Sequence, residues 1–209
     1  MSATAETAVK IRKGRKYDQV LDGARAVFLA HGFEGASVDD IARAAGVSKA
    51  TLYSYFADKR VLFMEVASQQ CQAQADLALQ QLDLSAPPDV VLRQGGRQFL
   101  GFVLSDMGQR IFRMVISECH RFPDLGAKFY ACGPMVMRRV LVCYLQEAQA
   151  RGQIRQGVDL DLASDQFSEL CRADLWHKMI LGLRRDVTPA EIARVVDAAV
   201  DTFLARYGV

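Results

Sequence analysis

Long apolar runs are missing from this sequence. No stretch approaches the roughly 18–20 consecutive apolar residues that a membrane-spanning helix requires, so we expect no membrane association. Residues 1–16 are basic but lack the apolar segment that follows the charges in a secretory signal. With neither feature present, the expected location is the cytoplasm.

Cysteines are few and scattered. No CxxC pair occurs, and an odd number of distant cysteines argues against a disulfide framework or a structural zinc site. We expect buried free thiols, because free cysteine is among the most buried residue types, with a redox-sensing role as the alternative. The five residues are Cys71, Cys119, Cys132, Cys143 and Cys171.

Patterns that mark catalytic or cofactor sites are also absent. The chain has no GxSxG, P-loop or HExxH motif. Its three histidines, His31, His120 and His177, are too dispersed in sequence to suggest a metal motif. We therefore expect no enzyme activity, no cofactor and no metal ion.

What the sequence does contain is helical periodicity. Hydrophobic residues make up 51% of the chain, enough for a packed core. Apolar residues such as Val20, Ala24 and Val27 recur at helical spacing, and no strand-like alternation is bounded by hairpin turns. The prediction is an all-α fold of about nine helices, in which Gly133-Pro134 should kink or break the seventh. The expected ranges are 17–31, 37–45, 49–55, 58–82, 88–105, 108–121, 123–150, 160–183 and 189–207.

Charge is distributed unevenly along the chain. The net charge of +2 hides ten Lys/Arg against seven Asp/Glu in residues 1–60, which is +3, and sixteen against seventeen in residues 61–209, which is −1. Five of the positive charges fall within residues 10–16. Such a basic arm can neutralise phosphates, although a solvated tail is the simpler interpretation.

Residues 37–56, SVDDIARAAGVSKATLYSYF, predict two short helices joined by a tight turn. Ser37 caps the first helix, with Asp40 three residues later. Gly46 permits the positive φ that the turn needs. Val47 and Leu52 pack the second helix on the first. This is the arrangement of a helix-turn-helix, whose second helix fits the major groove of DNA.

The second helix carries side chains suited to DNA. Ser48, Lys49, Thr51, Tyr53 and Tyr55 are hydrogen-bonding residues, and a small Ala50 allows close approach to a base edge. The alternative is an ordinary helical hairpin, in which the aromatic residues of this segment would be core. The short helix, the glycine turn and the nearby basic arm favour DNA binding.

The segment GARAVFLAHGFEGASVDDIARAAGVSKATLYSYFADKRVLF resembles the signature of the TetR/AcrR family of bacterial transcriptional regulators, over about residues 17–66 without a gap. The resemblance implies an all-α homodimer that binds a palindromic double-stranded DNA operator, usually as a repressor. It also implies that a small, mostly apolar inducer binds the C-terminal domain. The predicted domains are a basic flexible arm at 1–16, the helix-turn-helix domain at 17–60, and a ligand-binding and dimerisation domain at 61–209.

The resemblance also assigns DNA contacts by position. Lys49, Ala50 and Thr51 would face base edges or the nearby DNA backbone, and Tyr53 and Tyr55 would contact phosphates. Ser37 and Lys59, each at the start of a helix, would bind phosphates as well. One departure is Ala36, where family members often have threonine. The predicted DNA-binding residues are Arg15, Ser37, Ser48, Lys49, Ala50, Thr51, Tyr53, Tyr55 and Lys59.

A second segment, FRMVISECHRFPDLGAKFYACGP at 112–134, resembles the C-terminal domains of AcrR- and AefR-like members, which hold a mostly apolar pocket between helices. The alternative is that these aromatic and methionine residues are ordinary core packing. Polar members of the set would need a partner if buried. The predicted pocket residues are Phe99, Phe102, Val103, Met107, Met114, Glu118, Phe122, Phe129, Tyr130, Met135, Asp174, Trp176 and His177.

The last predicted helix offers a branched and small apolar stripe that could pair two protomers. The same stripe could instead dock on the chain's own core. The predicted interface residues are Ile192, Val195, Val196, Ala199, Val200 and Phe203. The function predicted from these patterns is a ligand-released repressor, and the alternative is an all-α ligand-binding protein that acts through protein contacts rather than DNA.

Overall fold

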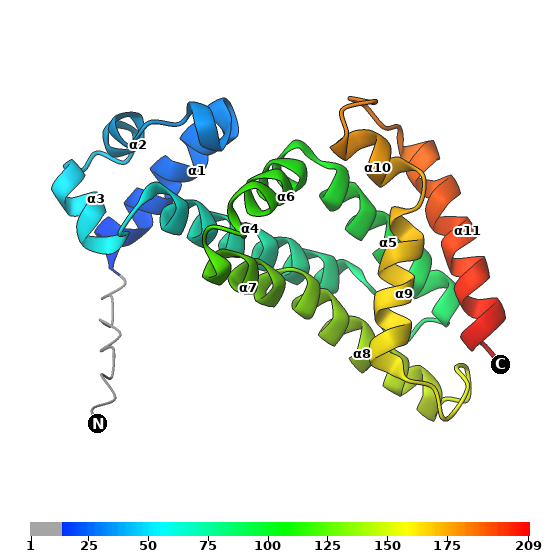
Figure 1. Ribbon diagram of the computed structural model, residues 1–209. Coiled ribbons are helices and arrows are strands. Elements are labelled where there is room, and N and C mark those ends of the chain that lie inside the picture. The colour runs from blue at the N-terminus through cyan, green and yellow to red at the C-terminus, as the bar shows by residue number, and fades with distance from the viewer. Residues whose placement is uncertain (1–13) are drawn as a thin grey trace, which may run out of the picture. The chain divides into compact units, whose positions relative to one another are not determined.

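The computed structural model describes residues 14–209, apart from the side chains at 74, 78 and 79, and these residues form eleven α-helices. The chain divides into two compact units, one up to Val66 and one from Ala67 to Val209, and helix α4 contributes to both (Figure 1). The helices are α1 (Arg15–Gly35), α2 (Val38–Ala44), α3 (Lys49–Tyr55), α4 (Lys59–Gln81), α5 (Pro88–Leu104), α6 (Asp106–Glu118), α7 (Pro123–Cys132), α8 (Pro134–Ala150), α9 (Leu160–Arg172), α10 (Leu175–Ile180) and α11 (Pro189–Tyr207).

The all-α prediction is confirmed, and two of the nine predicted helices are each divided in two. The division at Gly133-Pro134 was expected from the sequence. The division between α9 and α10 was not, because Asp174 carries no sequence signal of a break. Asp174 adopts a positive φ of 65°, and its carboxylate forms ion pairs with Lys178 and Arg194. These two charged partners hold a backbone conformation that a non-glycine residue rarely adopts.

The first unit is built on the contact between α1 and α2. Val20, Ala24 and Phe28 are buried along α1. Gly23 lies so close to the end of α2 that a Cβ atom built there would be 2.6 Å from the backbone nitrogen of Ala45. The helix was expected to end at Gly32, but helical turns resume after its non-helical φ of 71° and continue to Gly35.

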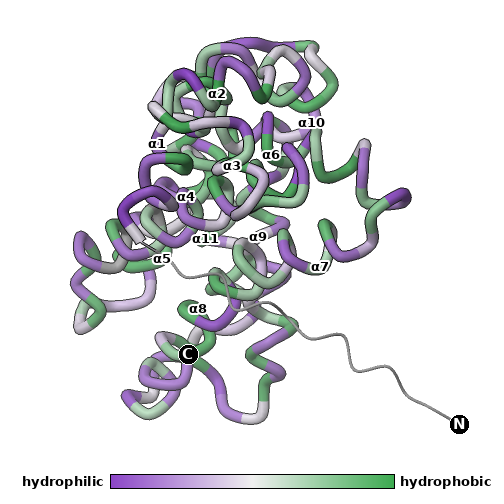
Figure 2. Tube along the Cα trace, turned by 90° about the vertical axis from the view of Figure 1, so that its left-hand side faces the viewer, coloured by the Kyte–Doolittle hydropathy of each residue, from purple (hydrophilic) through white to green (hydrophobic). Residues whose placement is uncertain are grey.

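In the second unit, α11 packs against both α5 and α9, as Figure 1 shows. Hydrophilic and hydrophobic residues are interspersed along the helices (Figure 2), as expected for helices that turn one face to a core. Charged residues join α5 to α11 at the edge of this contact: Arg93 lies 2.5 Å from Asp201, and Arg97 lies 2.8 Å from Asp197. In the described part of the chain, no helix is both long and apolar enough to cross a membrane.

The predicted dimer stripe on α11 faces the interior of its own chain. Ile192 is partly buried and packed against the core of the second unit. The other five residues of the stripe are buried within that core. Side chains that are fully enclosed by α5 and α9 cannot meet a second protomer. The interface prediction is therefore corrected for Val195, Val196, Ala199, Val200 and Phe203, and it stays a prediction for Ile192.

Candidate nucleic-acid interface and ligand cavity

Helices α2 and α3 are both short and are separated by a four-residue turn. Each begins with a serine whose hydroxyl accepts a backbone hydrogen bond: Ser37 from the amide of Asp40 at 3.0 Å, and Ser48 from the amide of Thr51 at 3.1 Å. Gly46 supplies the positive φ of 64° that turns the chain between them. The buried Leu52 holds α3 in place. The expected helix-turn-helix geometry is thus present.

The start of α3 is open to solvent. Ser48, Lys49 and Ala50 are exposed, and Tyr53 is half exposed. The ammonium of Lys49 lies 2.5 Å from a carboxylate oxygen of Asp39 on α2, in an ion pair whose two members are both exposed. Because exposed ion pairs contribute little, this contact can exchange for one to DNA at small cost.

Two predicted phosphate contacts are already engaged within the first unit. The ammonium of Lys59 donates to the carbonyl oxygens of Phe33 at 2.8 Å and Ala36 at 3.1 Å, and lies 4.4 Å from the centre of the Phe33 ring. Tyr55 is partly buried, with its ring edge-on to Tyr17 at 5.8 Å. Lys59 therefore fixes the end of α1 to the start of α4, an anchoring role that the sequence did not indicate.

The predicted basic arm meets the structure only at its end. Residues 1–13 lie outside the described part of the chain, and Arg15 and Lys16 are exposed residues in the first turn of α1 rather than in a flexible segment. Ala36 is buried, so the position at which a family threonine would offer its hydroxyl is enclosed in this chain.

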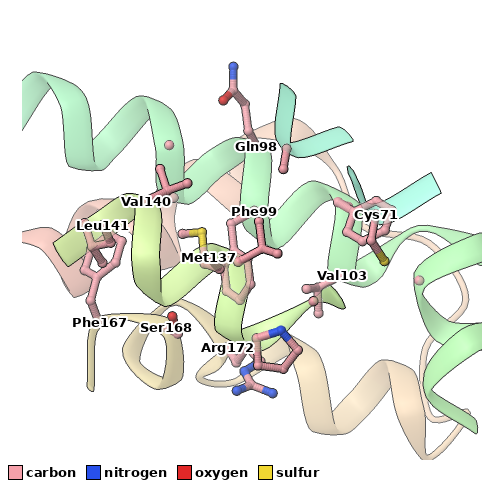
Figure 3. Close-up of a pocket in the computed structure, with 18 of the residues that line it drawn as sticks. Cys71, Gln98, Phe99, Val103, Met137, Val140, Leu141, Phe167, Ser168 and Arg172 are labelled. Atoms are coloured by element: carbon pink, nitrogen blue, oxygen red, sulfur yellow. The ribbon is translucent and has the colours of Figure 1, made fainter. Parts of the chain in front are cut away.

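The second unit contains a cavity of about 550 Å³. Figure 3 shows labelled side chains from α4, α5, α8 and α9 around it. Most of its wall is apolar, as in small-molecule sites generally, and it is large enough for a ligand of drug-like size. The predicted residues that line it are Phe99, Phe102, Val103, Phe129, Tyr130 and Trp176.

Seven predicted pocket residues lie away from the cavity wall. Met114 is buried on the other face of α6 from Phe112, which does line the cavity. Asp174 and His177 are exposed, and so is Met135. The corrected positions, none of which lines the cavity, are Met107, Met114, Glu118, Phe122, Met135, Asp174 and His177.

The polar residues of the cavity wall were not predicted from the sequence. Arg172 Nε and Gln98 Oε1 are buried atoms with no hydrogen-bond partner among the described residues. The rest of Arg172 is held by an ion pair with Glu169 and by the ring of Trp176, whose centre lies 5.9 Å from its guanidinium carbon. Ser168 also lines the cavity, so polar residues recur at helical spacing on one face of α9. That recurrence beside an apolar face was the signal available in the sequence.

Comparison with known proteins agrees with this geometry. Residues 20–66 match the tetR family of bacterial regulatory proteins, and residues 90–209 match the C-terminal domain of AefR-like transcriptional repressors. The chain belongs to the tetR family. It is a DNA-binding transcriptional regulator, and its α2–α3 pair is the family's helix-turn-helix.

Relatives of this tetR-family regulator match over different lengths. The HTH-type transcriptional repressor AcnR of Corynebacterium jeikeium is 27% identical over 143 residues, which cover 68% of this chain and 70% of that protein. The mycofactocin biosynthesis regulator MftR of Mycobacterium tuberculosis is 44% identical, but over only 27% of this chain and 29% of its own length. The higher identity thus belongs to the shorter match.

Two solved structures resemble nearly the whole regulator. A TetR-family regulator from Mesorhizobium loti is 28% identical, with a TM-score of 0.82, and the match covers 96% of this chain and all of that one. The flavonoid-responsive regulator FrrA is 36% identical, with a TM-score of 0.71, over 94% of this chain and 98% of its own. The similarity thus extends through the cavity-bearing unit.

Proposed function

We propose that this regulator is a ligand-released repressor that acts in the cytoplasm and binds a palindromic operator as a dimer. Two helix-turn-helix units on one face of DNA must be spaced by about one helical turn or a multiple of it, which a two-fold dimer provides. The exposed start of α3, with Ser48, Lys49 and Ala50, would read base edges in the major groove. The repressors among the relatives support the sign of regulation.

The observation that carries the sensor half is the cavity with its two unpartnered polar atoms. An acceptor at Gln98 Oε1 and a donor at Arg172 Nε suit a ligand that offers both a hydroxyl and a carbonyl or carboxylate oxygen. The apolar remainder of the wall suits a hydrophobic body. A flavonoid combines these features, and the name of FrrA supports that chemical class.

Ligand control requires that the cavity and the DNA-binding surface be coupled. Helix α4 carries Lys59 in the first unit and Cys71 on the cavity wall in the second. A ligand that binds more tightly to the form in which α4 does not support DNA binding favours that form. It lowers operator affinity by the factor by which its affinities for the two forms differ. No long-range change is needed other than in this one helix.

The first test is DNA binding to the region that flanks the regulator's own gene, measured by fluorescence anisotropy. The full chain should bind this DNA with an affinity that falls linearly with salt on logarithmic axes. Lys49→Ala should relax the preference for the operator over unrelated DNA. Equal affinity of the wild-type chain for both DNAs would overturn the repressor assignment.

The second test addresses the ligand. Quercetin, as a flavonoid probe, should bind the full chain in calorimetry and lower its operator affinity. Arg172→Met should weaken quercetin binding by about ten-fold or more, because it removes a buried donor. Arg139→Met is the matched control, since Arg139 is exposed on α8 and does not line the cavity. Confirmed binding with unchanged operator affinity would contradict the release mechanism.

A further inference from the structure

Two cysteines meet at the wall of the cavity. Cys71 lies on α4 and is buried, whereas Cys132 is the last residue of α7 and is only partly buried. The two thiols are close enough to interact with each other, and both line the cavity. Figure 3 shows Cys71 among the labelled lining residues. Helices distant in sequence thus bring together two groups that can share a covalent bond.

The surroundings of the two thiols make them unequal. The hydrogen bond from the Cys71 thiol, with a second one from the Ser68 side chain, lowers the pKa of Cys132 to about 7 against the opposing effect of burial. The same contact, together with burial, raises the pKa of Cys71. Cys171 differs, since burial in the core raises its pKa to about 12. Cys132 is therefore the member of the pair that ionises near neutral pH to the nucleophilic thiolate, whereas Cys71 stays protonated.

We propose that Cys71 and Cys132 are a redox-active pair, which an organic hydroperoxide entering the cavity oxidises to a disulfide. The Cys132 thiolate attacks the terminal oxygen of the hydroperoxide, the O–O bond breaks, and the alkoxide leaves as an alcohol after taking a proton from water. Cys132 becomes a sulfenic acid. Cys71 sulfur then attacks Cys132 sulfur, the S–O bond breaks, and water leaves with the Cys71 proton. Two thiols are oxidised, and one hydroperoxide is reduced to an alcohol and water.

The structure favours oxidation over simple alkylation of one thiol. A second thiol close to the first is the group that resolves a sulfenic acid, and alkylation has no use for it. The apolar wall favours an organic hydroperoxide over a small polar one. Gly133, which follows Cys132, has a non-helical φ of −111° and ψ of −85°, so α7 ends at Cys132 and does not continue into α8 as one helix.

The disulfide would tie α4 to the end of α7. Because α4 also carries Lys59 of the first unit, oxidation would fix the helix through which the cavity is proposed to control DNA affinity. This regulatory consequence rests on the proposed function, whereas the oxidation chemistry does not.

The chemistry is tested on the reduced full chain treated with cumene hydroperoxide and then alkylated with iodoacetamide in denaturant, so that buried thiols also react. Peptide mapping by mass spectrometry should show Cys71 and Cys132 protected together and joined in one linked peptide pair. Cys119 and Cys143 should stay reduced and should therefore be alkylated. Full alkylation of Cys71 and Cys132 after treatment, or a link from either to another cysteine, would overturn the proposal.

Variants separate the roles of the two thiols. Cys132→Ser should leave Cys71 reduced after peroxide treatment, and Cys71→Ala should leave a persistent sulfenic acid on Cys132 that dimedone labels. Cys143→Ser is the matched control at an exposed thiol and should form the same disulfide as wild type. Oxidation of Cys71 in the Cys132→Ser variant would contradict the assigned order of attack.

Operator affinity of the oxidised and reduced chains then tests the regulatory consequence, with a change of at least ten-fold expected. A disulfide that forms without altering affinity overturns that part. Failure of the reduced chain to bind the operator counts against the proposed function instead.

Discussion

The DNA-binding unit and the cavity-bearing unit are organised by contacts of different range. In the first, Ser37 and Ser48 cap α2 and α3 by bonding residues three positions away, and Gly46 turns the chain locally. In the second, Arg93 and Arg97 on α5 pair with carboxylates on α11 about a hundred residues later. Local contacts are written in short sequence motifs, whereas distant ones depend on how whole helices rotate against each other.

The largest expected effect comes from breaking the tight approach between α1 and the end of α2 in the DNA-binding unit. Gly23→Ala would place a Cβ atom 2.6 Å from the backbone nitrogen of Ala45, and a backbone atom cannot move aside cheaply. We expect a loss of about 3 kcal/mol of unfolding free energy, measured by urea denaturation, and loss of operator binding.

Gly101→Ala is the control for that change. Gly101 is also within a helix, but a Cβ atom there meets nothing within 4 Å. Alanine should stabilise the chain by about 0.5–1 kcal/mol, because glycine has the lower helix propensity. A Gly23→Ala variant as stable as wild type would show that α1 and α2 are not held by close backbone packing.

The same contrast explains what the sequence predicted. The caps, the glycine turn and the apolar spacing of α1–α3 are local, so the helix-turn-helix was placed nearly residue by residue. Phe99 and Met114 were chosen for the cavity by the same criterion, yet only Phe99 lines it. The periodicity of α6 does not say which buried face meets the cavity. The interface prediction for the buried residues of the α11 stripe was wrong for the same reason. An apolar helix face fits a partner chain or the chain's own core equally well.

Two lysines allow a sharper comparison within the DNA-binding unit. Lys59→Met removes the two hydrogen bonds to the carbonyls at the end of α1, so it should lower unfolding free energy by about 1–3 kcal/mol. Lys49→Ala breaks only an exposed ion pair and should change stability by less than about 0.5 kcal/mol.

DNA affinity should reverse the order of these two variants. Lys49→Ala should weaken operator binding by about 1–3 kcal/mol if it reads a base edge. Lys59→Met should weaken it less at a temperature where the variant remains folded. A stable Lys59→Met chain that loses binding to all DNA sequences would restore its predicted role as a phosphate contact.

The smallest effect concerns a local cap within the cavity-bearing unit. Glu191 completes the capping box of α11 with Thr188, and Arg184 lies 2.7 Å from its carboxylate. The hydrogen bond from Arg184, followed by those from Thr188, lowers the pKa of Glu191 from its ordinary 4.5 to about 2. A lowered pKa in the folded state stabilises the fold above the unfolded pKa, and this contribution is lost as pH falls from about 4.5 towards 2.

Carboxyl-carbon NMR titration should therefore find Glu191 still ionised at pH 3. Arg184→Met should raise its pKa without returning it fully to 4.5, because the Thr188 amide still donates to the carboxylate at 2.9 Å. In Glu191→Gln the acid-dependent part of the stability at this cap should vanish, since no titrating group remains there. An ordinary pKa for Glu191 in the wild-type chain would mean that the cap is not formed in solution. Formation of the cap would show that the cavity-bearing unit also uses short-range contacts, at the start of a helix whose packing is otherwise set by distant residues.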